Sequence, residues 1–340
     1  MATYAEIGIH LDDARRTTER LGEVVARARG VGVLADVGAF GGMFRLGAVG
    51  EFDDPVLVAS TDGIGTKVKV AAALDRYDTL GTDIVNHCVN DIAVQGARPL
   101  FFLDYLAQHH ADPDVVTAIV AGVADACAAA GCSLLGGETA EMPDVYPPGE
   151  FDLAGFVVGV MDRATIGANG VPVAGDTLLG LPSTGLHTNG YSLARRALPA
   201  ATWGDFDPAL KMTVGEALLA PHRSYLAEIQ KLIDIGARGF AHITGGGFPE
   251  NVARALPPDL TAEIDTTTWP PPAIFKRIAL EGFVHPSEMY RVFNMGIGLV
   301  GIVPTQRVEE AIGIVPEAIA IGKVVPRGDG AAVHLRGLVA

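Results

Sequence analysis

The sequence predicts an α/β fold of the α+β type, with two domains in which helices pack on sheets. The chain has 340 residues, more than one ordinary hydrophobic core accommodates. Short apolar runs rich in Val, Ile and Gly alternate with segments whose apolar residues have a helical period. Residues 162–176 contain Gly, Asn and Pro, which disfavour regular structure. We therefore expect a first domain at residues 1–167 and a second at residues 168–340.

In the first domain, a polar helix or arm is expected at the N-terminus and a strand directly after Pro55. Apolar side chains at helical spacing predict a helix over residues 79–97, and short apolar runs predict buried strands. The expected elements are the arm at 11–28, strands at 56–60, 99–106, 132–135 and 153–161, and helices at 79–97 and 113–130.

In the second domain, the same alternation continues, with a glycine-rich turn or loop between successive elements. The expected strands are 177–181, 240–243, 262–264, 297–303 and 318–322, and the expected helices are 191–198, 224–235 and 250–255, with further helical segments between the later strands.

Composition excludes several classes of protein. The chain has 25 basic and 40 acidic residues, a formal net charge of −15, so it lacks the positive charge that attracts nucleic acids and anionic membranes. Its longest apolar runs are shorter than the roughly 18 residues of a membrane-spanning helix. Three cysteines, an odd number, argue against a disulfide framework. With no apolar leader at the N-terminus, we expect a cytoplasmic protein that binds neither nucleic acid nor membrane.

The segment Ser-Thr-Asp-Gly-Ile-Gly-Thr-Lys, which follows the first strand, has residues suited to phosphate chemistry. Backbone amides near Gly63 and Gly65 can hold phosphate, together with Thr66 and Lys67. The Asp62 carboxylate can hold a metal ion. The spacing is not that of a Walker P-loop, and an ordinary glycine turn is the alternative.

The helix expected at residues 79–97 carries Asp83, His87 and Asp91 at intervals of four, which places them on one stripe. A solvated polar face is one interpretation. The other is a packed stripe, in which a buried Asp91 needs a cation or several hydrogen-bond donors.

A buried strand then opens into Gly136-Gly137-Glu138, with Glu141 three residues later. Carboxylates here, close to Asp62 or Asp91, would make the oxygen-rich site that Mg²⁺ uses with nucleotide phosphates. A capped turn at a helix start is the alternative.

Two segments of the second domain offer hydrogen-bond donors, namely small polar side chains and the backbone amides of glycines. Residues 182–192 include His187, a candidate acid or base, although a lone loop histidine is often only a surface residue. Residues 244–247 place three glycines before an expected helix, where amides can bind an anion. The segments together indicate a Mg²⁺-dependent enzyme acting on phosphorylated small molecules, but not which reaction it catalyses.

Six stretches of the sequence, in this order, resemble the phosphoribosylformylglycinamidine cyclo-ligases, also called aminoimidazole ribonucleotide synthetases. The stretches are STDGIGTK (60–67), VNDIAVQGARPLFFLDY (89–105), GCSLLGGETAEMP (131–143), GLHTNGYSLAR (185–195), HITGGGFPEN (242–251) and MYRVFNMGIG (289–298). The resemblance runs from about residue 4 to residue 335. Sister families share the shorter stretches, including thiamine-monophosphate kinases, selenophosphate synthetases and the hydrogenase-maturation dehydratase.

The resemblance implies a cytoplasmic enzyme of purine biosynthesis that uses ATP and Mg²⁺ to convert formylglycinamidine ribonucleotide into aminoimidazole ribonucleotide, ADP and phosphate. Phosphorylation turns the formyl amide oxygen into a good leaving group, and the amidine nitrogen then closes the ring. The resemblance also implies a homodimer, with the mixed sheet of the first domain pairing across the two-fold axis.

The resemblance implies roles for particular residues. Asp62, Asp91 and Glu138 would hold Mg²⁺ and ATP; Gly63, Gly65, Thr66, Lys67 and Gly137 would contact the nucleotide, with Lys67 on phosphate; Glu141, His187, Thr188 and Asn189 would face the substrate; and Thr244, Gly245, Gly246 and Gly247 would hold its 5′-phosphate. Asp62, Lys67, Asp91 and His187 are the catalytic candidates.

The sequence departs from the family pattern at three places. His10 stands where the family has an acid, Ala39 stands where the family has a second glycine after Gly38, and His109-His110 stands where a Gly-Lys pair is often found. These departures fall in the N-terminal arm and neighbouring loops, so they leave the exact ATP contacts open. A sister kinase and a binding module without turnover are the alternatives to the cyclo-ligase. Loss of the carboxylates would favour the module, yet Asp62, Asp91 and Glu138 are present.

Overall fold

The computed structural model describes residues 20–35 and 39–338. The chain divides into two compact units, the first containing Met1–Ile92 and Ala97–Arg163 and the second containing Ala93–Gly96 and Ala164–Ala340. Half of the predicted N-terminal arm, residues 11–19, lies outside the described residues, and its other half, residues 20–28, is helical. His10 and Gly38 also fall outside the described residues.

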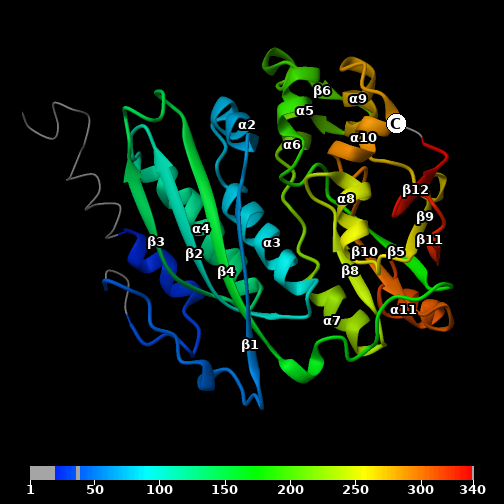
Figure 1. Ribbon diagram of the computed structural model, residues 1–340. Coiled ribbons are helices and arrows are strands. Elements are labelled where there is room, and N and C mark those ends of the chain that lie inside the picture. The colour runs from blue at the N-terminus through cyan, green and yellow to red at the C-terminus, as the bar shows by residue number, and fades with distance from the viewer. Residues whose placement is uncertain (1–19, 36–38, 339–340) are drawn as a thin grey trace, which may run out of the picture. The chain divides into compact units, whose positions relative to one another are not determined.

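The first unit is a four-stranded sheet with the strand order β1-β4-β2-β3 (Figure 1). Pairs β1–β4 and β4–β2 are antiparallel and β2–β3 is parallel, so the predicted mixed sheet is confirmed. Its elements are β1 (Pro55–Gly63), α2 (Lys67–Leu74), α3 (Leu80–Ala93), β2 (Arg98–Gln108), α4 (Pro113–Ala129), β3 (Ser133–Glu141) and β4 (Phe151–Asp162), with short 3₁₀ turns at Ala26–Ala28, Leu46–Ala48 and Arg163–Thr165.

Helix α3 packs closely on one face of this sheet because β4 has glycines there. A Cβ at Gly155 would lie 2.8 Å from Ile84 Cγ1, and one at Gly159 would lie 2.7 Å from Ile92 Cδ1. Helix α4 contacts β2 and β3, and it begins at an Asp112 cap whose carboxylate accepts from the amides of the first turn. Side chains alternate along a strand, so neighbouring residues serve the helix-covered face and the opposite face in turn.

Strand β3 is longer than expected. The sequence predicts a strand that ends at Leu135 and a loop that carries Glu138, but β3 continues to Glu141. The expectation of a loop is wrong because β3 pairs with β2 as far as Gln108↔Glu141, and these backbone hydrogen bonds outweigh the low strand propensity of two glycines. At Gly137 a Cβ would lie 2.2 Å from Asp104 Oδ1, so the carboxyl group of Asp104 occupies the space that a side chain would need.

Asp104 is a buried carboxyl group on the helix-covered face of β2. Burial raises its pKa to about 7. Between the unfolded pKa of about 4 and this value, the folded state binds the proton more tightly. The free energy of unfolding therefore falls as pH rises through that window, by on the order of 1.4 kcal/mol for each unit of pKa shift.

We expect Asp104→Asn to remove the share of this pH dependence that Asp104 contributes, because the neutral amide has nothing to titrate. Urea unfolding of both proteins at a series of pH values measures the effect. Parallel pH profiles for the wild type and the variant would show that Asp104 is not the group responsible.

The second unit is a six-stranded sheet with the strand order β12-β9-β11-β5-β10-β8. Only β12–β9 is a parallel pair among its described strands, so this sheet is also mixed. Its elements are β5 (Thr177–Pro182), α5 (Tyr191–Ala197), β6 (Phe206–Asp207), β7 (Met212–Thr213), α6 (Val214–Leu218), α7 (Leu226–Asp234), β8 (Gly239–His242), α8 (Gly247–Arg254), β9 (Leu260–Asp265), α9 (Ala273–Glu281), α10 (Pro286–Val292), β10 (Ile297–Val303), α11 (Val308–Ile314), β11 (Ile319–Pro326) and β12 (Val333–Arg336), with 3₁₀ turns at Ala200–Thr202, Thr266–Thr268 and Thr305–Arg307.

Strand β10 is fully buried, as its continuous apolar run predicts. Helices α7 and α11 share a hydrophobic core with β5 and β10, in which Leu232 and Ala311 meet Leu179 and Leu299. Helix α8 begins at Gly247, three residues before the expected start, because Gly246 and Gly247 both adopt the left-handed conformation that leads into the helix.

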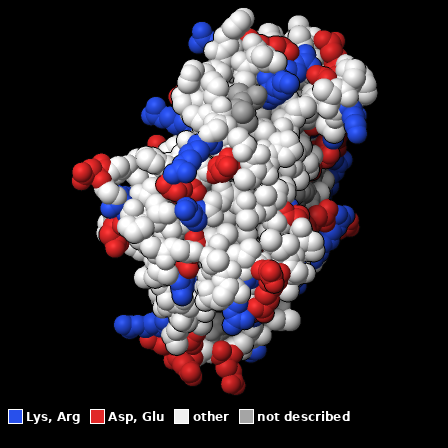
Figure 2. Space-filling model, turned by 90° about the vertical axis from the view of Figure 1, so that its right-hand side faces the viewer, with Lys and Arg blue, Asp and Glu red and all other residues white. Residues whose placement is uncertain are grey.

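Charges are mixed over the face drawn in Figure 2, where Lys and Arg lie among Asp and Glu around a broad uncharged area. No helix within the described ranges is long and apolar enough to cross a membrane.

Candidate functional site

A pair of carboxylates, Asp62 on β1 and Asp91 on α3, forms the polar centre of the first unit. The pKa of Asp62 is raised to about 7, chiefly by burial, then by the charge of Asp91 and a hydrogen bond with it. Ser60 Oγ donates to Asp91 Oδ2 at 3.3 Å, and His87 Nε2 lies 3.3 Å from Asp62 Oδ2. Two carboxylates so close repel each other unless a proton or a cation lies between them. The pair therefore has the donor chemistry for Mg²⁺.

The polar stripe of α3 is packed rather than solvated. Asp83 and His87 are buried, and Asp91 is half-buried. Lys67, the first residue of α2, is also fully buried, with its Nζ 2.7 Å from Asp83 Oδ2. Burial lowers the pKa of Lys67 even though the Asp83 charge opposes the shift. In this structure Lys67 therefore binds Asp83, and its contact with a phosphate stays a prediction.

Glu138 does not join the two aspartates within one chain. Strands β1 and β3 are opposite edges of the sheet. The pairings place Asp62, Gly155, Asp104 and Gly137 in one row across it. Glu138, one residue further, belongs to the opposite face. Three strand spacings also separate the edges by about 14 Å. A single chain thus brings together only two of the three predicted Mg²⁺ ligands.

Glu138 and Gly137 instead line a cavity of about 580 Å³. Its volume falls in the range of ligand pockets, which is roughly 300–1,000 Å³. Tyr105 and Phe156 contribute aromatic side chains to its lining, to which Ala39 also belongs. The cavity is therefore a candidate ligand pocket of the first unit, whereas Gly63, Gly65 and Thr66 lie at the other edge of the sheet with Asp62.

Glu141 is occupied by contacts within the first unit. Its Oε1 lies 2.8 Å from His110 Nδ1 and accepts from the amide of Ala111 at 2.8 Å. Neighbouring His109 Nδ1 lies 2.7 Å from the carbonyl oxygen of Tyr146. The His109-His110 departure from the family pattern thus supplies a partner for Glu141, and a substrate contact by Glu141 stays a prediction.

In the second unit, Thr244–Gly247 forms the loop that leads into α8, and the Asn251 side chain holds this loop by hydrogen bonds. Asn251 Nδ2 donates to the carbonyl oxygens of Thr244, Gly245 and Gly247, at 3.3, 3.1 and 2.8 Å. This arrangement holds the loop carbonyls on one side at the N-terminus of α8, where backbone amides attract anions. The loop is suited to a phosphate group.

The loop between β5 and α5 carries His187, Thr188 and Asn189. His187 has φ of 63°, a left-handed conformation that is uncommon for a residue other than glycine. It is buried, not a surface histidine. A Cβ at Gly245 would lie 3.7 Å from Asn189 Nδ2, so this loop adjoins the glycine-rich loop. The structure thereby brings together the predicted substrate-binding residues of the second unit.

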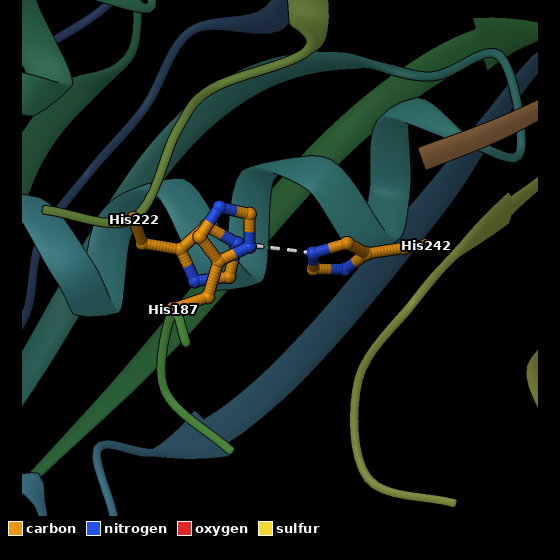
Figure 3. Close-up of side chains that lie close together, drawn as sticks. All are labelled: His187, His222 and His242. Carbon is orange, nitrogen blue, oxygen red and sulfur yellow. Dashed lines mark hydrogen bonds between the residues drawn. The ribbon is translucent and has the colours of Figure 1, made fainter. Parts of the chain in front are cut away.

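His187 stacks on His222, with ring centroids 4.0 Å apart and planes at 19°. His222 Nε2 lies 3.0 Å from His242 Nε2 (Figure 3). Thr188 Oγ1 lies 3.3 Å from His222 Nδ1. Sequence reasoning missed His222, which a distant segment brings to these loops. It also did not single out His242 and Asn251, although they are the two ends of the quoted stretch HITGGGFPEN (242–251).

Two family models match the chain. The AIR synthase related protein N-terminal domain matches residues 46–161, and the C-terminal domain of the same family matches residues 173–334. Together they cover most of the chain and both of its sheets.

Similar folds occur among solved structures. E. coli HypE has a TM-score of 0.67 at 20% identity, over 96% of this chain and 94% of that one. Thiamine-monophosphate kinase from Stenotrophomonas maltophilia K279a has a TM-score of 0.64 at 17% identity, over 94% and 96%. A hydrogenase maturation protein HypE in complex with ATP has a TM-score of 0.59 at 19% identity, over 82% and 81%. At these identities the likeness shows the fold, and with the two domain matches it establishes that the chain belongs to the family of AIR synthase related proteins.

Proposed function

We propose that the chain is an ATP- and Mg²⁺-dependent cyclo-ligase that converts formylglycinamidine ribonucleotide into aminoimidazole ribonucleotide, ADP and phosphate in purine biosynthesis. The observation that carries the proposal is the clustering of sequence-predicted residues into two chemically distinct sites. Asp62 and Asp91 meet in the first unit, and the His187 loop adjoins the glycine-rich loop in the second. The six sequence stretches that resemble the cyclo-ligases support this reaction over others of the family.

In the proposed reaction, bound ATP supplies the phosphoryl group that makes the formyl oxygen a leaving group. Asp62 and Asp91 hold the Mg²⁺ that accompanies ATP. The amides of Gly245–Gly247 bind the 5′-phosphate of the substrate, and Asn189 orients its ribose. His187 moves the proton of the attacking amidine nitrogen. Positioning and charge neutralisation supply most of the catalysis for phosphoryl transfer.

We further propose that the enzyme is a homodimer that pairs through the first unit. On the face of the sheet opposite α3, Leu57 and Phe156 are exposed apolar side chains. Glu138 belongs to the same face, so pairing would bring it to a nucleotide site shared by two chains. This arrangement offers a reason why Glu138 lies away from Asp62 in a single chain.

ADP release with Mg²⁺ and ATP, measured with and without formylglycinamidine ribonucleotide, tests the proposed reaction. A parallel colour assay follows the aminoimidazole product. We expect ADP release only with the substrate, in one-to-one ratio with product. Release without substrate, or with thiamine monophosphate instead, would favour a sister kinase such as the structural neighbour. No release would favour a binding module.

Asp91→Asn tests the carboxylate pair in the same assay. Removal of one ligand charge should lower the rate by on the order of a hundredfold. Asp125→Asn, on the exposed side of α4, is the matched control and should keep the wild-type rate. Equal rates for the two variants would remove Asp91 from the site.

A further inference from the structure

His187 occupies a strained turn that its surroundings have to hold in place. Its φ of 63° lies in the left-handed region, where a residue with a side chain persists only if neighbouring groups fix it. Tyr191 Oη donates to the carbonyl oxygen of His187 at 3.1 Å, and the amide of Thr184 donates to His187 Nε2 at 3.4 Å. The imidazole ring also stacks on His222 (Figure 3). These contacts fix the loop at His187 itself, and the start of the loop has a separate anchor.

Asn294 anchors the start of this loop from a distant part of the chain. Its side chain is buried, with 3% exposed. Asn294 Nδ2 donates to the carbonyl oxygen of Gly185 at 2.9 Å, and Asn294 Oδ1 accepts from Ser183 Oγ at 3.0 Å. Gly185 and Ser183 come directly before the turn at His187, so the two hydrogen bonds fix where that turn begins.

The segment that carries Asn294 is itself held in one conformation. Met295 and Gly296, the next two residues, have left-handed φ values of 48° and 94°. Asn294 Oδ1 accepts from the amide of Gly296 at 2.9 Å, which closes this turn. At Gly298, in β10, a Cβ would lie 2.6 Å from His187 Cε1, so the same segment leaves room for the imidazole ring. The segment therefore provides both a fixed anchor for the loop and space for the ring.

We propose that Asn294 is a positioning residue for His187, because it fixes the loop in which His187 takes its left-handed turn and so places the imidazole for proton transfer. This role rests on the proposed function, in which His187 moves the proton of the amidine nitrogen. It assigns a task to the stretch MYRVFNMGIG (289–298), which the proposed reaction leaves without one. Asn294 acts through the loop rather than on the substrate.

Asn294→Asp tests the anchor with little change in shape. An aspartate keeps an oxygen for the Ser183 hydroxyl and the Gly296 amide, but it has no hydrogen to donate to the carbonyl oxygen of Gly185. The single hydroxyl proton of Ser183 cannot serve both oxygens. The variant therefore keeps the turn after Asn294 and releases the loop that leads to His187.

Asn169→Asp is the matched control. Asn169 Nδ2 donates to the carbonyl oxygens of Ile233 and Ala237, at 2.8 and 3.1 Å. The substitution removes bonds of the same kind and adds the same charge, but these residues belong to neither substrate loop. Urea unfolding of both variants checks that each is folded.

Hydrogen exchange over residues 183–190, followed by mass spectrometry, reports the anchor without turnover. We expect exchange there to be faster by about tenfold or more in Asn294→Asp, and as in the wild type in Asn169→Asp. Equal exchange in Asn294→Asp and the wild type would overturn the proposal. The comparison holds whether or not the wild type makes the aminoimidazole product, so a failure of the anchor and a failure of the proposed function can be told apart.

Kinetics separate positioning from a purely structural role. Asn294→Asp should lower kcat by about tenfold or more and keep KM for formylglycinamidine ribonucleotide within about threefold, because the glycine-rich loop still binds the 5′-phosphate. A folded variant with lower stability and an unchanged kcat would overturn the proposal. Should Asn294→Asp not fold, Ser183→Ala carries the test, since it removes the other contact between Asn294 and the loop. A folded Ser183→Ala protein with wild-type exchange and kcat would overturn the proposal equally.

Discussion

Lys67→Met should lower the free energy of unfolding by about 3–5 kcal/mol, because it leaves the buried Asp83 carboxylate without its cation. Both side chains are fully buried, and Lys67 Nζ lies 2.7 Å from Asp83 Oδ2. Solvent cannot replace the ammonium group there. Methionine has nearly the same length as the lysine stem, so the loss comes from charge rather than from a cavity. Urea unfolding at neutral pH measures it.

The double variant Lys67→Met/Asp83→Asn is the matched control. Removal of both charges should restore at least half of the lost stability, since paired buried charges contribute little over neutral groups of the same shape. If Lys67 instead serves chiefly as a phosphate contact, the single variant keeps its unfolding free energy and loses only ATP-dependent activity. That result would contradict the structural role that the geometry gives it.

Gly247→Ala should cost about 3 kcal/mol or more, the second large effect that the structure predicts. Gly247 begins α8 with φ of 58°, and a Cβ there would lie 2.0 Å from the carbonyl oxygen of Tyr290. The obstacle is backbone, which cannot rotate away as a side chain does. The glycine-rich loop would shift, so affinity for inorganic phosphate should fall together with stability.

A control for the backbone conformation alone is Gly167→Ala. Gly167 has φ of 68° and no atom within 4 Å of its would-be Cβ. The left-handed conformation should cost about 1–2 kcal/mol there, and the difference between the variants isolates the clash with Tyr290. Equal losses would mean that the loop yields without strain and that Gly247 is not fixed by α10. Thermal unfolding of both variants makes the comparison.

The sequence allowed much of the fold to be predicted, because periodicity marks elements that bury one face. Helix α3 and strands β4 and β10 occur where apolar spacing predicts them. The end of β3 could not be predicted in the same way. Glu138 lies in a strand because β2 offers a partner for its backbone, and pairing between segments is invisible to local propensity.

The candidate site shows the same division. Spacing along one helix predicted that Asp83, His87 and Asp91 lie on one stripe. It did not predict whether that stripe is buried. The Lys67–Asp83 pair decides this, and it joins two helices. His222 had no local signal, and His242 was not singled out within the stretch HITGGGFPEN, because separate segments of the chain bring the histidines together. Chemistry that depends on a single segment could be predicted, whereas chemistry assembled from three segments could not.

The alternation along β1 has a consequence for how the chain tolerates insertions. Asp62 faces α3 while its neighbour Gly63 belongs to the opposite face, so odd and even positions of one strand serve separate tasks. Loss or gain of one residue ahead of Asp62 would exchange the two sets, while a change of two residues would keep them. A substitution on one face of β1 therefore leaves the other face intact. Insertion or deletion of a single residue instead changes the side chains on both faces together.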